Sequence, residues 1–268
     1  MEFLNNQRFE TIELEANNDW LHVKLNRPKS KNALSSIMIT ELINLISLAE
    51  SQQFLRGIFL SGKEGSFCSG ADLKEFKSFF SSGKPKKNEI ISSSLNVAKL
   101  LKSFYHFPKY VIACIDGPAY AGGFGLACCS DFIFATKNSK FGITEIKIGL
   151  TPAQIAPYVI NRLGRKNAKN LMLSGEVFDT ERALDLGLLD KVFGNEQDMV
   201  SFAKNFSNNL KPCAPNAVAI TKSIISNLDN SSNFSAIAAE KFAECMLGEE
   251  TPEGLQAFIE KRKPSWNL

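Results

Sequence analysis

Apolar and polar residues along the chain follow two periods, one typical of β-strands and one typical of α-helices. Residues 21–25 alternate apolar and polar side chains, as a half-buried strand does, and several later apolar runs are typical of buried strands. Residues 34–46 and 88–104 carry apolar side chains at helical spacing, and Asn88 stands where an N-cap is expected. The predicted strands are residues 21–25, 57–61, 110–115, 131–136 and 140–143. Strands that alternate with helices predict an α/β core with parallel pairing.

Beyond residue 149 the pattern becomes mostly helical, and no internal repeat is visible. Gly175 is expected to end one of these helices, and residues 187–193 are expected to form a last short strand. Polar segments at residues 81–87 and 229–233 predict a mobile loop and a linker. The expected helices are residues 165–174, 180–185, 201–210, 216–227 and 234–246. The C-terminal part of the chain is therefore predicted to be helical.

A glycine-rich turn follows the strand predicted at residues 110–115. Residues 117–127 read Gly-Pro-Ala-Tyr-Ala-Gly-Gly-Phe-Gly-Leu-Ala and lead into a helix of small residues. Such a turn presents bare backbone N–H groups at the positive end of a helix dipole, and glycine lets the backbone approach a ligand closely. Residues 66–75 show the same strand-to-helix arrangement. The two turns predict a site for a developing negative charge, although either one alone is equally typical of a tight turn that binds nothing.

A single carboxylate, Glu145, stands in an apolar segment of the chain. Ile143, Ile146 and Ile148 are its neighbours in the sequence and are expected to surround it. Partial burial raises the pKa of a carboxyl group, which suits a group that both gives and takes a proton near neutral pH. The alternative is a surface acid or an ion pair with Lys147.

Composition indicates a large core and narrows the classes of function. The chain has 268 residues, of which 44% are hydrophobic, and a net charge of +3 with acids and bases mixed. A nucleic-acid-binding protein would usually show a basic stripe. The chain has two histidines, His22 and His106, and we expect both to be structural. Two histidines argue against a zinc site and against a histidine-based triad.

The six cysteines form no Cys-x-x-Cys pair and mostly lie in apolar runs. We expect reduced, buried thiols, as in a cytosolic protein. Cys68 has no base nearby that would make it a thiolate. The chain shows no basic start followed by an apolar run, and no apolar stretch reaches the length of a membrane span. We therefore expect a cytoplasmic, bacterial protein that binds neither nucleic acid nor a membrane.

These segments together resemble the crotonase family, also called the enoyl-CoA hydratase/isomerase superfamily. The resemblance takes in residues 26–28 (Asn-Arg-Pro) and 32–34 (Asn-Ala-Leu) near the start and residues 257–263 near the end. It runs from about residue 21 to residue 263, which is nearly the whole chain. No single motif is specific, but their order and spacing together are specific.

The resemblance implies two parts in each subunit. A crotonase-like spiral of ββα units would occupy residues 1–200, and a C-terminal helical trimerisation region would occupy residues 201–268. The family usually forms trimers and pairs of trimers, so a homotrimer or hexamer is expected. Phe258 and Lys261 would then contact the coenzyme A that a neighbouring subunit binds.

The family binds acyl-CoA thioesters and stabilises an enolate on the thioester oxygen. By their position in the motifs, the backbone N–H groups of Ala71 and Gly122 would receive that oxygen. Hydratases of the family usually carry two glutamates at the reacting carbon. One of them matches Glu145, whereas the other position is Gly125, which cannot transfer a proton. Either Glu145 performs both proton steps with a water, or the reaction needs only one acid/base group.

The segments around Gly125 and Glu145 resemble the branches of the family that keep one glutamate. One branch hydrates branched, methylglutaconyl-CoA-like thioesters, and a polyketide-associated branch dehydrates a hydroxymethylglutaryl thioester. The Δ3,Δ2-enoyl-CoA isomerases also manage with one glutamate. We expect hydration of a 2-enoyl-CoA, and in particular of a branched or carboxylated one. The alternatives are an isomerase, a dehydratase of CoA or carrier-protein thioesters, and a non-catalytic CoA-thioester-binding or scaffold protein.

The resemblance also implies which residues contact coenzyme A. Coenzyme A is part of the substrate, so no separate cofactor and no metal are expected. Lysines would serve as point charges for its phosphates, and its adenine would lie across the backbone near Ala33 and Ala71. The implied substrate-binding residues are Lys29, Lys31, Asn32, Ala33, Ser69, Ala71, Asp72, Leu73, Lys74, Gly122 and Gly125, besides Phe258 and Lys261. The side chains of Asp72, Glu75 and Asp131 are expected to have structural or surface roles.

Overall fold

A mostly parallel sheet forms the centre of the computed structural model, which describes residues 8–78, 86–227 and 234–267. Its six strands lie in the order β1 (Ile12–Asn17), β2 (Trp20–Leu25), β3 (Gly57–Gly62), β4 (Tyr110–Ile115), β6 (Phe132–Thr136) and β9 (Lys191–Phe193). β1 pairs antiparallel with β2, and the other neighbours pair parallel. The predicted α/β core with parallel pairing is confirmed.

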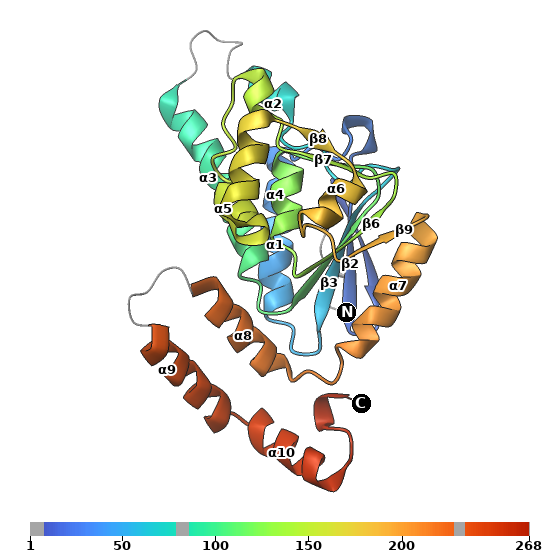
Figure 1. The fold of residues 1–268 in the computed structure, drawn as a ribbon, viewed down its shortest axis with the longest axis vertical. Coiled ribbons are helices and arrows are strands. Elements are labelled where there is room, and N and C mark those ends of the chain that lie inside the picture. Colours follow the sequence, from blue (N-terminus) through green and yellow to red (C-terminus); the bar gives the residue numbers. More distant parts are fainter. Residues whose placement is uncertain (1–7, 79–85, 228–233, 268) are drawn as a thin grey trace.

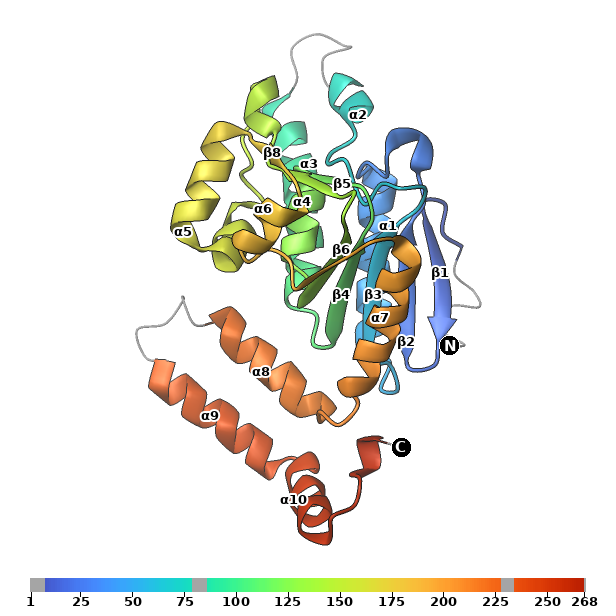
Figure 2. The same cartoon turned by 45° about the vertical axis from the view of Figure 1, so that its right-hand side comes forward.

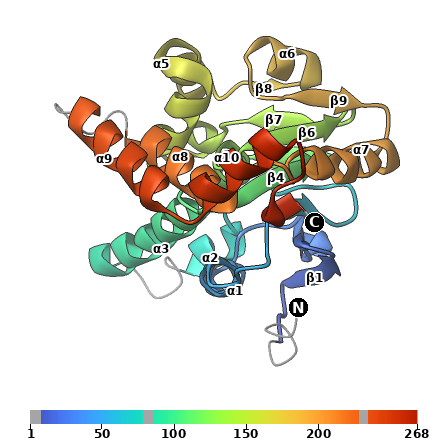
Figure 3. The same ribbon diagram turned by 90° about the horizontal axis from the view of Figure 1, so that it is seen from below.

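Both faces of this sheet are covered, as Figures 2 and 3 show. In β4, Val111 and Ala113 belong to the main core, which also contains residues of α1 and α3. Ile112 and Cys114, which alternate with them, belong to a second core with residues of α7. Because side chains alternate between the faces of a strand, a strand buried on both faces is a continuous apolar run. This is why residues 110–115 were recognisable as a buried strand.

Helices follow most of the strands and carry the chain back across the sheet (Figure 1). The helices that pack on or beside the sheets are α1 (Ser36–Glu50), α2 (Leu73–Ser78), α3 (Lys87–Tyr105), α4 (Gly122–Cys128), α5 (Ala156–Ser174), α6 (Thr180–Asp185) and α7 (Glu196–Asn209). Ser35 caps α1 by accepting a hydrogen bond from the Met38 N–H at 3.2 Å, which satisfies an N–H that has no partner within the helix. The predicted N-cap of α3 is wrong: the helix already begins at Lys87, so Asn88 lies in its first turn, and Lys86 occupies the cap without a side-chain bond.

A small second sheet stands beside the first. It contains β5 (Pro118–Tyr120), β7 (Lys140–Gly142) and β8 (Val177–Phe178), in that order. Short 3-10 helices lie between some strands and the helices that follow them. Among them, η2 (Pro28–Ser30) lies between β2 and α1, and η3 (Glu145–Ile148) lies between β7 and α5. This sheet joins the end of β4 to the end of β6 and so positions the segment that contains Glu145.

The C-terminal helices leave the body of the molecule, as Figure 1 shows. They are α8 (Pro215–Asn227), α9 (Phe234–Leu247) and α10 (Glu250–Glu260), followed by the 3-10 helix η5 (Ser265–Asn267). The predicted division at residue 200 falls inside α7, which packs on the sheet. The predicted linker at residues 229–233 and most of the predicted loop at residues 81–87 lie outside the described residues.

The cysteines follow the expected burial in part. Cys68, Cys114, Cys128 and Cys129 are buried, but Cys213 is exposed, because it lies in the turn between α7 and α8 rather than in the core. Among the helices that the structure describes, none combines the length and the apolar character needed to cross a membrane.

Candidate active site

Several chain segments come together beyond the carboxyl ends of the parallel strands, where open α/β sheets place their ligands. Isolated bridges pair Leu34 with Ala71 and Cys68 with Ala119. The loop after β3 therefore lies between the segment that follows β2 and strand β5. β5 in turn pairs with β7, so the segment that leads to Glu145 joins the same cluster. The sheet edge thus brings together the three motifs that the sequence singled out.

The backbone N–H groups of Ala71 and Gly122 both lie at this place, and neither has a hydrogen-bond acceptor within the described part of the chain. The Leu34 N–H donates to the Gly70 carbonyl at 2.8 Å, and the Asp72 N–H donates to the Leu34 carbonyl at 3.1 Å. These bonds flank Ala71 and leave its own N–H free. A Cβ built on Gly122 would lie 3.9 Å from the Ala71 nitrogen, and one on Gly70 would lie 3.5 Å from the Gly122 nitrogen. The two predicted donors are therefore brought side by side.

Glycine makes this approach of two backbones possible. A Cβ on Gly70 would lie 2.8 Å from the Ala121 Cβ, and Gly70 has a φ of 97° that L side chains rarely adopt. A Cβ on Gly123 would lie 2.4 Å from the Cys68 carbonyl oxygen. Ala121 itself is strained, with φ 50° and ψ −120°, and its N–H donates to the Gly142 carbonyl at 2.9 Å. The donor at Gly122 is thus held by a strained turn that is tied to β7.

Glu145 begins η3 and has a half-buried side chain. Burial raises the pKa of its carboxyl group above the ordinary value. Its Oε2 atom is buried and has no hydrogen-bond partner among the described residues. The described residues contain no ion pair between Glu145 and Lys147, so the ion-pair alternative is not what the structure contains. A buried carboxylate oxygen without a partner is unusual and needs an explanation.

The isoleucines near Glu145 are arranged differently from the expectation. Ile143 is fully buried, but Ile146 and Ile148 are exposed. The reason is the turn of η3, which directs successive side chains to different sides of the segment. The expectation that all three surround the carboxylate is therefore wrong for two of them.

The place of the second glutamate, at Gly125, is filled by a side chain from elsewhere. A Cβ on Gly125 would lie 2.2 Å from Cγ2 and 2.7 Å from Cβ of Ile155. Ile155 is 3% exposed and stands just before α5. Gly125 therefore does not leave an empty space, because Ile155 packs directly on its backbone.

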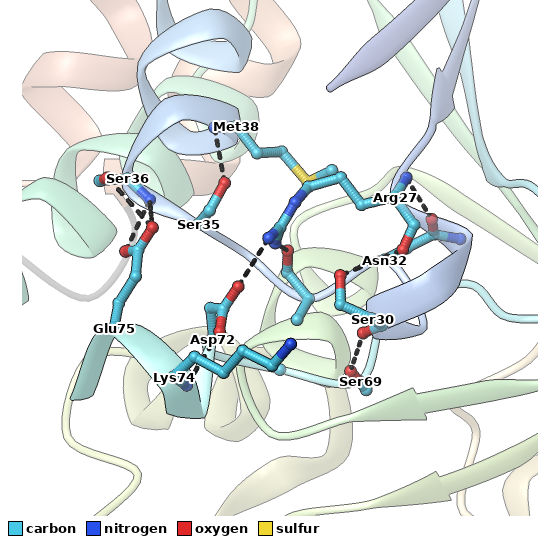
Figure 4. A network of polar contacts seen from close by, with 12 residues as sticks. Arg27, Ser30, Asn32, Ser35, Ser36, Met38, Ser69, Asp72, Lys74 and Glu75 are labelled. Carbon is cyan, nitrogen blue, oxygen red and sulfur yellow. Dashed lines mark hydrogen bonds and ion pairs between the residues drawn. The ribbon is translucent and has the colours of Figure 1, made fainter. Parts of the chain in front are cut away.

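The predicted coenzyme A contacts fall into two groups. Lys29, Lys31, Leu73 and Lys74 are exposed around the donor loop and are free to meet a ligand. Asn32, Ala33, Ser69 and Asp72 instead use their polar groups within the protein (Figure 4). Asp72 is 6% exposed, and its two oxygens accept from Arg27 Nη2 at 2.7 Å and from the Lys74 N–H at 2.9 Å. The side chains of Asp72 and Asn32 thus make contacts within the protein. For the Asp72 side chain this is the structural role that was expected.

Phe258 and Lys261 lie far from this place in the same chain. Both are exposed at the end of α10, and Figure 1 shows α10 at the opposite end of the molecule from α2. Within one subunit they do not reach the donor loop, so a contact with coenzyme A would require the neighbouring subunit to which the prediction assigned them.

Cys68 and the two histidines take no part in the polar chemistry of this place. Cys68 is fully buried, and burial raises the pKa of its thiol to about 12, so it is a packing residue and not a thiolate. His22 is buried, and its Nε2 atom lies 2.9 Å from Ser61 Oγ. His106 ends α3. The structure thus supports structural roles for these residues.

Two cavities of about 400 and 520 Å³ lie elsewhere, on either side of Arg56 at the amino ends of the strands. Arg56 Nη2 donates there to the Leu210 carbonyl at 3.3 Å and so ties β3 to the end of α7. These cavities are separate from the free donors and from Glu145.

Two residues of the site were not recognised in the sequence. Arg27 was noticed only as part of the Asn-Arg-Pro motif, and its bond to Asp72 spans 45 positions. Ile155 carried no signal at all, because it stands well before the helix predicted at residues 165–174 and is indistinguishable from any core isoleucine. Both depend on contacts between segments that are distant in the sequence.

An α/β body with paired backbone donors and a half-buried carboxylate at the strand ends defines an enzyme of the crotonase class. The family model described as enoyl-CoA hydratase/isomerase matches residues 15–268, and the chain belongs to this family. The predicted family is therefore confirmed, and the protein is an enzyme of the hydratase/isomerase type.

Individual relatives cover nearly the whole chain. The short-chain-enoyl-CoA hydratase of Clostridium acetobutylicum is 32% identical over 247 residues, which are 90% of this chain and 91% of that protein. The mevalonyl-coenzyme A hydratase sidH of Aspergillus fumigatus is 29% identical over 253 residues, 92% of this chain and 90% of that protein. The crystal structure of an enoyl-CoA hydratase/isomerase from Marinobacter aquaeolei superimposes with a TM-score of 0.90 at 33% identity and covers 96% of this chain and 99% of that one.

Proposed function

We propose that the protein adds water to the double bond of a 2-enoyl-CoA thioester, with Glu145 as the sole side-chain acid/base. The observation that carries this proposal is the buried Oε2 of Glu145, which has no partner in the described structure and a raised pKa. A carboxylate in this state is poised to hold a water and to exchange a proton with it near neutral pH.

The free N–H groups of Ala71 and Gly122 suit the second requirement of the reaction, which is to stabilise the negative charge on the thioester oxygen. The thioester carbonyl oxygen accepts hydrogen bonds from the Ala71 and Gly122 N–H groups, which become stronger as negative charge develops on it. Glu145 takes a proton from water, the hydroxide adds to the β-carbon, and the enolate oxygen rests on the two donors. Glu145 then returns the proton to the α-carbon on the same face, so the addition is syn and the carboxylate is regenerated. No second acid is needed in this cycle.

The packing at Gly125 supports a one-carboxylate reaction. Ile155 fills the space into which a glutamate at position 125 would extend, so a second carboxylate has no room there. The relative that is named a mevalonyl-coenzyme A hydratase is consistent with a branched acyl group, and we propose a branched, methylglutaconyl-like 2-enoyl chain. Lys29, Lys31 and Lys74 would meet the phosphates of coenzyme A.

The proposal is tested with a panel of thioesters. Straight-chain, branched and carboxylated 2-enoyl groups, each carried by CoA and by a carrier protein, are followed through the absorbance of the conjugated thioester. Wild type is expected to consume a branched 2-enoyl-CoA, and Glu145→Gln is expected to lose at least about 100-fold in kcat while it still binds the ester. Full turnover by Glu145→Gln would overturn the assignment.

The same panel separates the alternatives. A 3-enoyl-CoA that is converted to the 2-enoyl isomer, with no hydration of 2-enoyl esters, would indicate the isomerase, which also needs one base. Turnover of the carrier-protein esters alone would indicate the polyketide-type dehydratase reaction. Tight binding without turnover of any ester would indicate a binding or scaffold protein.

We also propose that the subunits assemble into a trimer or hexamer through the C-terminal helices. These helices expose several large apolar side chains, namely Phe242, Met246, Leu247, Leu255, Phe258 and Ile259. A concentration of exposed apolar side chains in one region is typical of an interface. Assembly would also bring Phe258 and Lys261 within reach of a neighbouring site.

A further inference from the structure

A single guanidinium group holds both sides of the bridge that carries the Ala71 donor (Figure 4). Arg27 Nη1 donates to the Ala33 carbonyl at 2.6 Å, and Arg27 Nη2 donates to Asp72 Oδ2 at 2.7 Å. Ala33 directly precedes Leu34, and Asp72 directly follows Ala71. Because Leu34 and Ala71 are the bridged residues, Arg27 ties one side of the bridge to the other.

The backbone of Arg27 is itself held in place by hydrogen bonds. Its backbone N–H donates to Asn32 Oδ1 at 2.8 Å, and its carbonyl accepts from the Asn32 N–H at 2.9 Å. Asn32 is fully buried, and its Nδ2 donates to the carbonyls of Lys63 at 3.0 Å and Ser66 at 2.6 Å. Lys31 and Asn32 both have a left-handed backbone, with φ of 51° and 54°, a conformation that persists only where surrounding bonds impose it. The segment of backbone that carries the guanidinium group is therefore rigid.

Asp72 is an ionised, buried member of this pair. Burial alone would raise the pKa of its carboxyl group, but the hydrogen bond from Arg27 and the Lys74 N–H hold the pKa below the ordinary value. Both oxygens of Asp72 are thus engaged within the protein. Removal of either partner would leave a buried charge uncompensated and free the loop to move.

We infer that Arg27 and Asp72 are positioning residues that hold the Ala71 N–H in line with the Gly122 N–H. The pair touches neither the substrate nor the reacting atoms; it acts through the Leu34–Ala71 bridge. The inference rests on the proposed function, because it assigns these residues to the oxygen-binding pair of that reaction. A pair that positions a transition-state donor supports the rate more than it supports binding.

The test compares turnover, binding and carbonyl polarisation in the full-length protein. A conjugated 2,4-dienoyl-CoA serves as the probe, because polarisation of its carbonyl by the two donors shifts its absorption to longer wavelength. Asp72→Asn, which keeps the shape of the side chain, is expected to lower kcat by about 10- to 100-fold with the best enoyl-CoA. Its affinity for the dienoyl-CoA should stay within about threefold of wild type, and the absorption shift should shrink.

Arg27→Lys provides a milder variant if Asp72→Asn fails to fold. A lysine keeps the charge but reaches only one of the two acceptors, so an intermediate loss of kcat and of the absorption shift is expected. Wild-type values of both quantities in the folded Arg27→Lys variant would contradict the inference.

The ion pair of Lys222 with Asp131 is a matched control. Its atoms Nζ and Oδ2 also lie 2.7 Å apart, and it is largely buried at the amino ends of β4 and β6, away from the donors. Lys222→Met is expected to lower Tm while it keeps wild-type kcat and the full absorption shift. If Asp72→Asn behaves like this control, the pair is only structural and the inference is wrong. If wild type hydrates no ester, the proposed function fails, whereas the absorption shift still decides the role of the pair.

Discussion

At the scale of the residue, the carboxyl group of Glu145 stands in surroundings that oppose its charge. Its pKa is raised by burial, so the folded protein favours the protonated form more than the unfolded chain does. The stability that this group contributes is present at acidic pH and is lost as the pH rises through its folded pKa. At neutral pH the ionised carboxylate therefore destabilises the fold.

Glu145→Gln should accordingly be inactive yet more stable than wild type at pH 7. The gain in the free energy of unfolding should disappear as the pH falls below the ordinary pKa of glutamate, because both proteins then carry a neutral side chain. Urea unfolding at several pH values measures this. In the same series, the acid limb of the wild-type kcat/KM profile should lie above the pKa of an ordinary glutamate. A variant that is less stable than wild type at pH 7 would contradict the burial argument.

His22 predicts a second dependence on pH, with the opposite sign. Burial, aided by the charge of Lys24, lowers its pKa from 6.5 to about 4. Between these two pH values, His22 is protonated in the unfolded chain and neutral in the folded protein. The free energy of unfolding therefore falls as the pH drops from 6.5 towards 4, by up to about 3 kcal/mol. His22→Gln should flatten this part of the stability profile and cost about 1 kcal/mol at pH 8 through the weakened bond to Ser61. Parallel profiles for variant and wild type would show that His22 does not titrate in this window.

The candidate donors and the candidate acid could be proposed from the sequence because each stands in a local motif. Ala71 and Gly122 were assigned by their positions in the motifs of the family that the chain resembles, and Glu145 is a lone acid in an apolar segment. The groups that position them could not be found, since Arg27 meets Asp72 only after the sheet has formed. Ile155 likewise acquires its meaning only from its contact with Gly125.

At the scale of the element, α4 and the start of α5 are fitted to each other through Gly125 and Ile155. A glutamate at position 125 would begin with a Cβ 2.2 Å from Ile155 Cγ2, so one of the two helices must move. Gly125→Glu should therefore lose activity and lower the free energy of unfolding by about 1–3 kcal/mol, the usual cost of overpacking. It should not restore a two-carboxylate hydratase.

Ile155→Ala in the same chain should relieve the collision. The double variant should be more stable than the sum of the single effects predicts, and a double-mutant cycle of urea unfolding measures this coupling. Gly194→Ala is the matched control, because a Cβ there meets nothing within 4 Å, and its stability should stay close to wild type. Additive effects of the changes at 125 and 155 would contradict direct packing.

Helices and strands could be predicted where apolar residues kept one period, helical or extended, over enough positions. The buried strands and the helices α1 and α3 met this condition, and α6 was found at residues 180–185, as the structure has it. The helix predicted at residues 165–174 is too short, because α5 already begins at Ala156. β1, β5 and β8 were not predicted, because they are short or mixed in polarity and are defined mainly by their partners. The last strand was predicted too long, since residues 187–190 form a loop before β9.

At the scale of the whole molecule, the C-terminal helices predict the assembly state. Phe258 is 84% exposed at the end of α10, an unfavourable position for a phenylalanine in a lone subunit. Wild type should sediment as a trimer or hexamer at micromolar concentration, and Phe258→Asp should shift it towards smaller species. Leu173→Asp, at an exposed apolar residue of α5, is the control and should stay assembled. A wild-type protein that sediments as a stable monomer would contradict the proposal.

The order of the strands in the large sheet has a consequence for how the chain is made. From β1 through β9 the strands lie side by side in the order in which they leave the ribosome, and β1 and β2 form a hairpin across Asn18 and Asp19. Each later strand can join the open edge of the one synthesised before it, without displacing a wrong neighbour. Until β9 arrives, the growing edge is the whole length of the last strand made, whereas the finished sheet ends there in the three-residue β9. A long open edge is prone to pair with other chains. Synthesis that pauses before residue 191 would therefore prolong the period in which the nascent chain can aggregate.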